Sequence, residues 1–257
     1  MGILKKLFLV IFAALIVLVN GMAYGSTISV GDNKIIINGS IYNNSVVQSI
    51  DIDQTVDISN YKGIQNIYVE QLYGSVEFRE STCNNIQLVL RGSSSCQLYI
   101  ETYSAEDYLE ICVKSEEQNF SFDGTLYIYV PSDLKPSVDL ITVSGDVLLY
   151  DENMAFSSLG FQSTSGNVEI HSSFQSCIIE TVSGNIHLAP CAQKNVQIVA
   201  YSISGDISIE LTSFGNCIFR CQTISGNIVN NYTNSNSANG FTAEVTASTV
   251  SGNVLIR

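Results

Sequence analysis

The sequence predicts an all-β protein, built as a single-stranded β-solenoid with a less regular β N-terminal half. Composition is the first observation: the 257 residues are 46% hydrophobic and 14% charged, with no Trp and three Pro. This mixture, rich in Val, Ile, Thr and Tyr, favours strands over helices. The second observation is a motif that occurs six times in the second half of the chain. The third is period-2 alternation of apolar residues on both sides of each copy, which indicates two strands per repeat.

The N-terminus reads as an export signal. Lys5 and Lys6 precede an unbroken apolar run of 13 residues, 7–19, and small residues follow at Ala23 and Gly25. This is the pattern of a cleaved signal peptide, and the run is shorter than the roughly 20 residues that span a bilayer. We expect residues 1–25 to be removed, an uncleaved anchor being the alternative. The sequence therefore predicts a secreted, extracytoplasmic protein of the cell surface or envelope, without strong membrane binding after cleavage.

The chain is acidic, with a formal net charge of −13. Without the two signal lysines, nine basic residues face 24 acidic ones. Nucleic acids and anionic lipids require basic patches, so this balance argues against both as partners. The expected partner is an unidentified surface ligand, a glycan or a protein.

The region before the motifs is less regular. Residues 26–60 are interpreted as an N-terminal strand or cap region, and residues 61–257 as the solenoid domain. Strand-like segments without the motif fill residues 61–135. Two segments resemble degenerate corners, Tyr73-Gly74-Ser75-Val76 and Asp123-Gly124-Thr125-Leu126.

The regular repeats occupy residues 138–257 and carry the motif Thr/Ser-x-Ser-Gly-Asp/Asn-Val/Ile. Successive glycines are 21, 18, 21, 21 and 26 residues apart, so we expect one coil per 18–26 residues. Gly tolerates positive φ and Asp or Asn tolerates left-handed conformations, so each motif is interpreted as a corner between strands. Stacked coils would align the serines and the Asp or Asn side chains in ladders. The predicted corners are Ser144, Gly145, Asp146, Ser165, Gly166, Asn167, Ser183, Gly184, Asn185, Ser204, Gly205, Asp206, Ser225, Gly226, Asn227, Ser251, Gly252 and Asn253.

Four positions per repeat predict the core: seven and five residues before each glycine, and two and four after it. All are apolar except Asn230. The column two residues after the glycine contains Val147, Val168, Ile186, Ile207, Ile228 and Val254.

The strand 126–130, the segment Pro131-Ser132-Asp133-Leu134-Lys135 and the motif that begins Thr142-Val143-Ser144-Gly145-Asp146-Val147 resemble the bacterial "putative adhesin" family. This is a domain of unknown function with Ser-Gly-Asn/Asp β-strand repeats. The resemblance covers residues 60–257 and is strongest from residue 124 onward. It implies a β-solenoid in an extracytoplasmic or cell-surface setting, and it brings no catalytic or binding residues. Seven Cys and an Asn-rich insert at residues 230–240 depart from simple members.

No catalytic set emerges from the sequence. Asp146 and Asp206 share a column but are expected three coils apart, about 14 Å, beyond the roughly 5–10 Å of a glycosidase pair. His171 and His187 lie five and three residues after their glycines. They are interpreted as separate surface imidazoles in different columns. The sequence therefore predicts no catalytic residues, no metal site and no cofactor.

The cysteines are interpreted mainly as small core residues. Cys177, Cys217 and Cys221 share the inward parity. In a strand, Cys217 and Cys221 are about 13 Å apart, too far for one zinc ion or a disulfide. The sequence leaves the pairing of Cys83, Cys96, Cys112 and Cys191 open.

These patterns favour an adhesin-like binding or structural module without catalytic activity. An envelope-associated sensor or scaffold that binds cationic peptides or a protein is the alternative, and a polysaccharide-active β-helix enzyme is a minor one. Because the chain ends just after the strand 253–256, we expect an open sheet edge there. Either the loop 230–240 caps it in a monomer, or two chains pair end to end.

Overall fold

The computed structural model describes residues 28–31, 34–37, 40–43, 49–117, 120–191, 195–233 and 240–257. The expected signal peptide lies outside these residues. The chain divides into two units, residues 1–48 and 49–257. The first contains a three-stranded antiparallel sheet of β1 (Ile28–Gly31), β2 (Lys34–Ile37) and β3 (Ser40–Asn43). No helix long and apolar enough to cross a membrane occurs in the described part of the chain.

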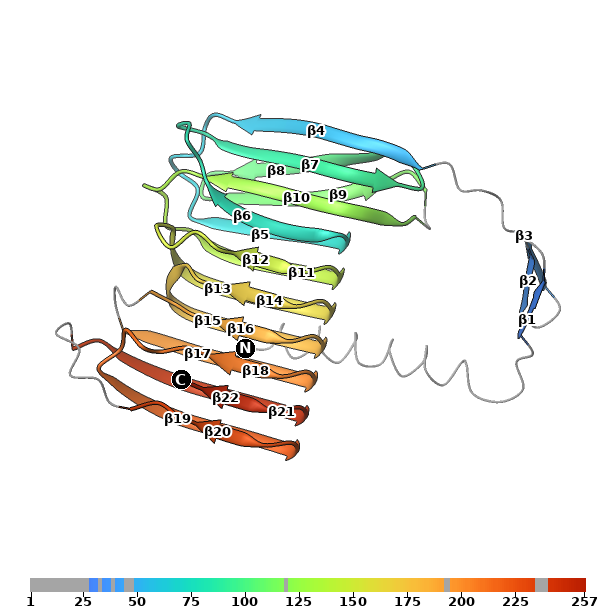
Figure 1. Cartoon of the computed structure of the whole chain (residues 1–257). Coiled ribbons are helices and arrows are strands. Elements are labelled where there is room, and N and C mark those ends of the chain that lie inside the picture. Colours follow the sequence, from blue (N-terminus) through green and yellow to red (C-terminus); the bar gives the residue numbers. More distant parts are fainter. Residues whose placement is uncertain are drawn as a thin grey trace. The chain divides into compact units, whose positions relative to one another are not determined.

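The second unit consists of two mixed sheets, which confirms the all-β class (Figure 1). Sheet I contains β4 (Ile50–Ile58), β6 (Ser75–Glu80), β7 (Ile86–Ser94), β10 (Phe122–Val130), β12 (Val147–Leu149), β14 (Val168–Ile170), β16 (Ile186–Leu188), β18 (Ile207–Ile209), β20 (Ile228–Asn230) and β22 (Val254–Ile256). Sheet II contains β5 (Asn66–Tyr73), β8 (Leu98–Ala105), β9 (Tyr108–Ser115), β11 (Ser137–Ser144), β13 (Ala155–Ser165), β15 (Ser173–Ser183), β17 (Val196–Ser204), β19 (Asn216–Ser225) and β21 (Thr242–Ser251).

Each motif copy supplies one strand to each sheet, with the Ser-Gly corner between them. Neighbouring repeats pair in parallel and in register, so that Val147 lies opposite Val168 and Val168 opposite Ile186. The degenerate corner at Gly74 joins β5 to β6 in the same way, and β5 pairs in parallel with β11. The second degenerate corner does not turn, because Gly124 lies inside β10 and pairs with Gly92.

The N-terminal half differs from a solenoid because several of its strands are antiparallel. Strand β7 runs antiparallel to both β4 and β10, and β8 runs antiparallel to β9. Strand β4, assigned to the cap region from the sequence, is the edge strand of sheet I. The structure is therefore two mixed sheets. Parallel pairing runs from the motif copies through β5 and β6 to β9 and β10, and antiparallel pairing adds β4, β7 and β8.

The last two repeats do not follow chain order. Sheet I has the order β20-β22-β18-β16-β14-β12-β6-β10-β7-β4, and sheet II the order β19-β21-β17-β15-β13-β11-β5-β9-β8. The final repeat, β21–β22, lies between the fourth copy, β17–β18, and the fifth, β19–β20. The predicted open edge at the C-terminal strand is therefore wrong. That strand is paired on both sides, and the fifth copy forms the end of the stack.

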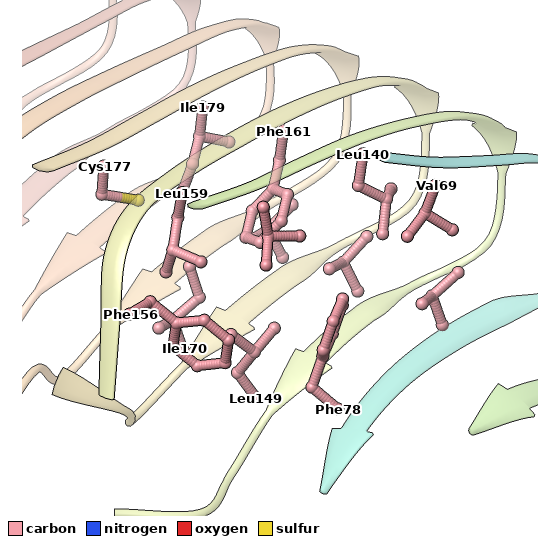
Figure 2. Packing of buried hydrophobic residues seen from close by; sticks show 14 of the residues in the cluster. Val69, Phe78, Leu140, Leu149, Phe156, Leu159, Phe161, Ile170, Cys177 and Ile179 are labelled. Carbon is pink, nitrogen blue, oxygen red and sulfur yellow. The ribbon is translucent and has the colours of Figure 1, made fainter. Parts of the chain in front are cut away.

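The core fills the space between the two sheets with one row of side chains from each. Figure 2 shows Phe78, Leu149 and Ile170 from sheet I packing against Val69, Leu140 and Phe161 from sheet II. The four predicted inward columns are buried in five of the six copies. In the fifth copy Ile228 is 46% exposed, because no further repeat covers it.

Candidate functional site

The corner edge is the line of seven corners where the chain passes from sheet II to sheet I. Six rows are the motif copies, and the seventh is Tyr73-Gly74-Ser75. The register aligns Tyr73 with Ser144, and then continues through Ser165, Ser183, Ser204, Ser251 and Ser225. At a strand spacing of about 4.8 Å, the edge is about 29 Å long.

A hydrogen-bond ladder holds the rows of the corner edge together. In each row the backbone N–H of the Asp or Asn donates to a side-chain oxygen of the row before. The nitrogen of Asn167 lies 2.7 Å from Oδ1 of Asp146, and that of Asn185 lies 3.0 Å from Oδ1 of Asn167. The ladder begins at the hydroxyl of Ser75, which accepts from the N–H of Asp146 at 3.3 Å. These bonds satisfy backbone donors that turn away from both sheets.

The corner glycines are required because the backbones of successive rows approach closely. A Cβ built on Gly184 would lie 1.9 Å from the carbonyl oxygen of Gly166, and one on Gly205 would lie 2.1 Å from that of Gly184. Positive φ adds to this requirement at only some rows, such as Gly145 with φ of 142°. Contact between rows is therefore the more general reason for glycine, whereas the sequence interpretation relied on φ alone.

Behind the serines, the first residue of each motif turns inward. Thr249 donates from its buried hydroxyl to the carbonyl oxygen of Gly205 at 3.2 Å, and Ser202 donates likewise to Gly184 at 3.3 Å. In the seventh row Gln71 takes this place, and its amide nitrogen donates to the carbonyl oxygens of Tyr73 and Ser75. Gln71 was not predictable from the repeat, because the motif is degenerate in this row.

The outer surface of the corner edge combines polar and apolar groups. A groove of about 520 Å³ runs along five of its rows, lined by Ser75, Ser144, Gly145, Asp146, Ser165, Gly166, Asn167, Ser183, Gly184, Asn185 and Ser204. Beside it runs a stripe of six aliphatic side chains and one threonine, here called the aliphatic stripe, formed by the residue before each serine or its equivalent. The stripe consists of Leu72, Val143, Thr164, Val182, Ile203, Val250 and Ile224. All seven are exposed or half-buried, and Ile224 is 82% exposed.

The structure brings the two histidines together, which contradicts the interpretation of separate imidazoles. On the outer face of sheet I, Glu169 on β14 lies opposite His187 on β16. His171 follows two residues after Glu169 and points to the same face. Its Nε2 lies 3.0 Å from Oε1 of Glu169, and the two imidazole centroids are 5.7 Å apart. The ligand atoms of Glu169, His171 and His187 all lie within 4.8 Å of one another.

Tyr150 completes this histidine cluster. Its hydroxyl donates to Oε2 of Glu169 at 2.9 Å. Partial burial, together with this bond, raises the pKa of Tyr150 to about 12. Partial burial also raises the pKa of Glu169, but hydrogen bonds from His171 and Tyr150 outweigh it, so the net pKa is below the ordinary value. Glu169 is therefore held as a carboxylate. The pattern was visible in the sequence, since Glu169 and His187 both lie three residues after their motif glycines.

The two aspartates considered as a catalytic pair have a structural role. Asp146 and Asp206 both serve as acceptors in the corner ladder, in rows separated by Asn167 and Asn185.

All seven cysteines are free thiols. Cys177 is fully buried, and burial raises the pKa of its thiol. Cys177 points into the core, as the period-2 alternation predicts. The half-buried Cys217 and Cys221 follow the same alternation.

Residues 64–257 match the family described as Toastrack DUF4097. The chain belongs to this family. A search of curated proteins found no significant match. The Toastrack DUF4097 match covers both sheets from the start of β5 to the C-terminus, including every row of the corner edge and the histidine cluster.

Similar solved structures include a putative cell adhesion protein from Clostridium sporogenes, 12% identical, covering 80% of this chain and 99% of that one, with a TM-score of 0.48. A putative adhesin from Bacteroides fragilis is 13% identical, covers 80% of this chain and 97% of that one, and has a TM-score of 0.42. A putative lipid binding protein from Parabacteroides distasonis is 14% identical, covers 79% and 96%, and has a TM-score of 0.32.

Proposed function

We propose that this chain is an exported surface module that binds an extended glycan along the corner edge, in an adhesin-like role and without catalysing a reaction. The observation that carries the proposal is repetition. Each of the six motif rows presents a serine hydroxyl and an Asp or Asn side chain at a fixed spacing, with an aliphatic side chain beside them in every row except that of Thr164. A linear array of equivalent subsites suits a linear polymer with repeating units.

The chemistry of the edge favours a sugar polymer. Hydroxyl, amide and carboxylate groups supply hydrogen bonds, while the aliphatic stripe provides apolar contact for sugar faces. The formal charge of −13 and the carboxylates of Asp146 and Asp206 disfavour an anionic glycan. A neutral or amino-sugar glycan therefore fits best.

The scaffold suits such a role because binding requires little rearrangement. The corner ladder and the sheet hydrogen bonds fix every row relative to the next, so the array is formed before the ligand arrives. We read the repeat half as a solenoid-like scaffold. Export through the predicted signal segment, residues 1–25, places it at the cell surface or in the envelope, where polymeric glycans are present.

A glycan array with three proteins tests the proposal. The wild type is compared with Val182→Lys/Ile203→Lys, which places two long charged side chains on the stripe. The matched control is Ser176→Lys/Gln197→Lys, on the same strands and the same outer face but about 20 Å from the edge. We expect the stripe variant to lose binding and the control to retain it.

Analysis of the bound sugar by mass spectrometry separates binding from turnover. We expect the glycan to be recovered intact. Shortened products would favour the enzyme alternative. A blank array combined with specific capture of cationic peptides would instead support the sensor alternative and contradict the glycan proposal.

A further inference from the structure

The histidine cluster lies on the outer face of sheet I, away from the corner edge along β14 and β16. Its positions are set by the backbone. Glu169 and His187 are register partners on adjacent parallel strands, and Glu169 and His171 are two residues apart. The N–H of His171 donates to the carbonyl oxygen of Leu149 at 2.7 Å, which fixes the end of β14 against β12. Three donor side chains thus converge from a rigid surface.

The spacing of the donor atoms is close to that of a tetrahedral metal site. With metal–ligand bonds of about 2.0–2.1 Å, two donors on a tetrahedral zinc ion are about 3.3 Å apart. Nε2 of His171 and Oε1 of Glu169 are already 3.0 Å apart, and His187 lies within 4.8 Å of both. The donor nitrogen of His187 is therefore at most about 1.5 Å beyond the spacing of a tetrahedral site.

The types of donor select the class of metal. Two imidazoles and one carboxylate suit zinc and similar transition metals, whereas magnesium and calcium prefer oxygen ligands alone. Tyr150 supplies the outer contact that such sites normally have, because its hydroxyl holds the second oxygen of Glu169 at 2.9 Å. The side chains of His171 and Glu169 are 28% and 34% exposed, so an ion from solvent reaches them directly.

We propose that Glu169, His171 and His187 bind one divalent transition-metal ion of the zinc class. Three protein donors leave a coordination position open on the solvent side. That position accepts water or a donor atom from a bound molecule. The site is distinct from the corner edge and does not depend on glycan binding there.

Calorimetric titration of the purified protein with Zn²⁺, carried out without a polyhistidine tag, tests the proposal. We expect one site per chain. His187→Gln and Glu169→Gln each remove a ligand and are expected to weaken binding by at least about 10-fold, and Tyr150→Phe by about 10- to 100-fold, as for other outer contacts. The matched control is Glu210→Gln, an acidic residue of the next repeat paired with Arg257, which should bind Zn²⁺ like the wild type.

Binding of Zn²⁺ by the free cysteine thiols is the competing explanation for a calorimetric signal. Titration with Co²⁺ distinguishes thiolate ligands from the histidine cluster. Cobalt bound by nitrogen and oxygen gives visible bands without the near-ultraviolet thiolate charge-transfer band. We expect the former spectrum, lost in His187→Gln. Thermal melts without metal establish that each variant is folded. A thiolate band, or equal Zn²⁺ affinity in the wild type and folded His187→Gln, would overturn the proposal.

Discussion

Oδ1 of Asp206 lies 2.7 Å from the backbone nitrogen of Asn253, which is 47 positions later in the sequence. The motif that follows Asp206 in the chain is that of Asn227, yet Asn227 donates to Asn253 instead, at 3.0 Å. The final repeat is therefore inserted between its two predecessors. This insertion pairs the C-terminal strand on both sides and leaves β19 and β20 at the end of the stack.

Substitutions in one core column test this strand order. Ile207 is 1% exposed and Ile228 is 46% exposed, although both occupy the position two residues after a motif glycine. A buried, unpaired carboxylate costs several kcal/mol, so Ile207→Asp should prevent stable folding. Ile228→Asp should cost about 1 kcal/mol or less. Urea denaturation measures both. Equal, large losses would place Ile228 inside the stack and contradict the inserted repeat.

The ladder oxygen of Asp206 contributes to stability through its acceptor role. Asp206→Ala removes the acceptor for the N–H of Asn253 and should lower the free energy of unfolding by about 1 kcal/mol. Asp206→Asn retains a carbonyl oxygen in that place and should change the free energy of unfolding very little. Asn167 and Asn185 already act as acceptors through this oxygen in other rows. Chemical denaturation of the two variants decides it. If Asn destabilised as much as Ala, charge rather than acceptor geometry would be responsible.

The corner glycines should be intolerant of any side chain. Gly184→Ala places a Cβ 1.9 Å from a backbone oxygen that cannot move without separating the rows, so we expect a loss of about 3 kcal/mol or more. Gly240→Ala is the control, because no atom lies within 4 Å of its Cβ and only its φ of 63° opposes the change. That strain costs about 1–2 kcal/mol. Thermal melts showing a smaller loss at Gly184 than at Gly240 would refute close approach as the constraint.

Stability should depend on pH through Glu180. Burial raises the pKa of this half-buried side chain, which lies between Gln162 and Tyr201 in sheet II. The folded state therefore disfavours the ionised form, and its contribution is unfavourable above the raised pKa and vanishes below the unfolded value. Glu180→Gln should be more stable than the wild type at neutral pH, with the difference shrinking as pH falls toward about 4. A difference that persists at low pH would show that charge is not its cause.

The fold of the repeat half was predictable because it depends on local patterns. Period-2 alternation identified the inward columns, and the Ser-Gly-Asp/Asn motif located every regular corner. Strand order was not predictable, since parallel repeats of similar sequence pair equally well in either order. Two signals of the exchanged order of the last two repeats were nevertheless present. Asn230, in the fifth copy, is the one polar residue in the inward columns. The 26-residue spacing before the sixth copy gives the chain enough length to pass back over the fifth.

The histidine cluster was missed for a different reason. His171 and His187 lie in different columns, and the repeat pattern alone does not show that the two columns come into contact. Adjacent columns on one face are close enough for long side chains to meet diagonally across strands. Antiparallel pairing in the N-terminal half was also hidden, because strands β4, β7 and β8 carry no motif that fixes their partners or direction.

Binding of oligosaccharides of increasing length tests the central claim most directly. If the corner edge is a linear array of equivalent subsites, calorimetry with oligomers of the glycan selected on the array should show affinity rising with each added sugar. The rise should stop when the oligomer reaches about 29 Å, the length of seven rows at strand spacing. Affinity that is already maximal for a mono- or disaccharide would reveal a single compact pocket and contradict the account.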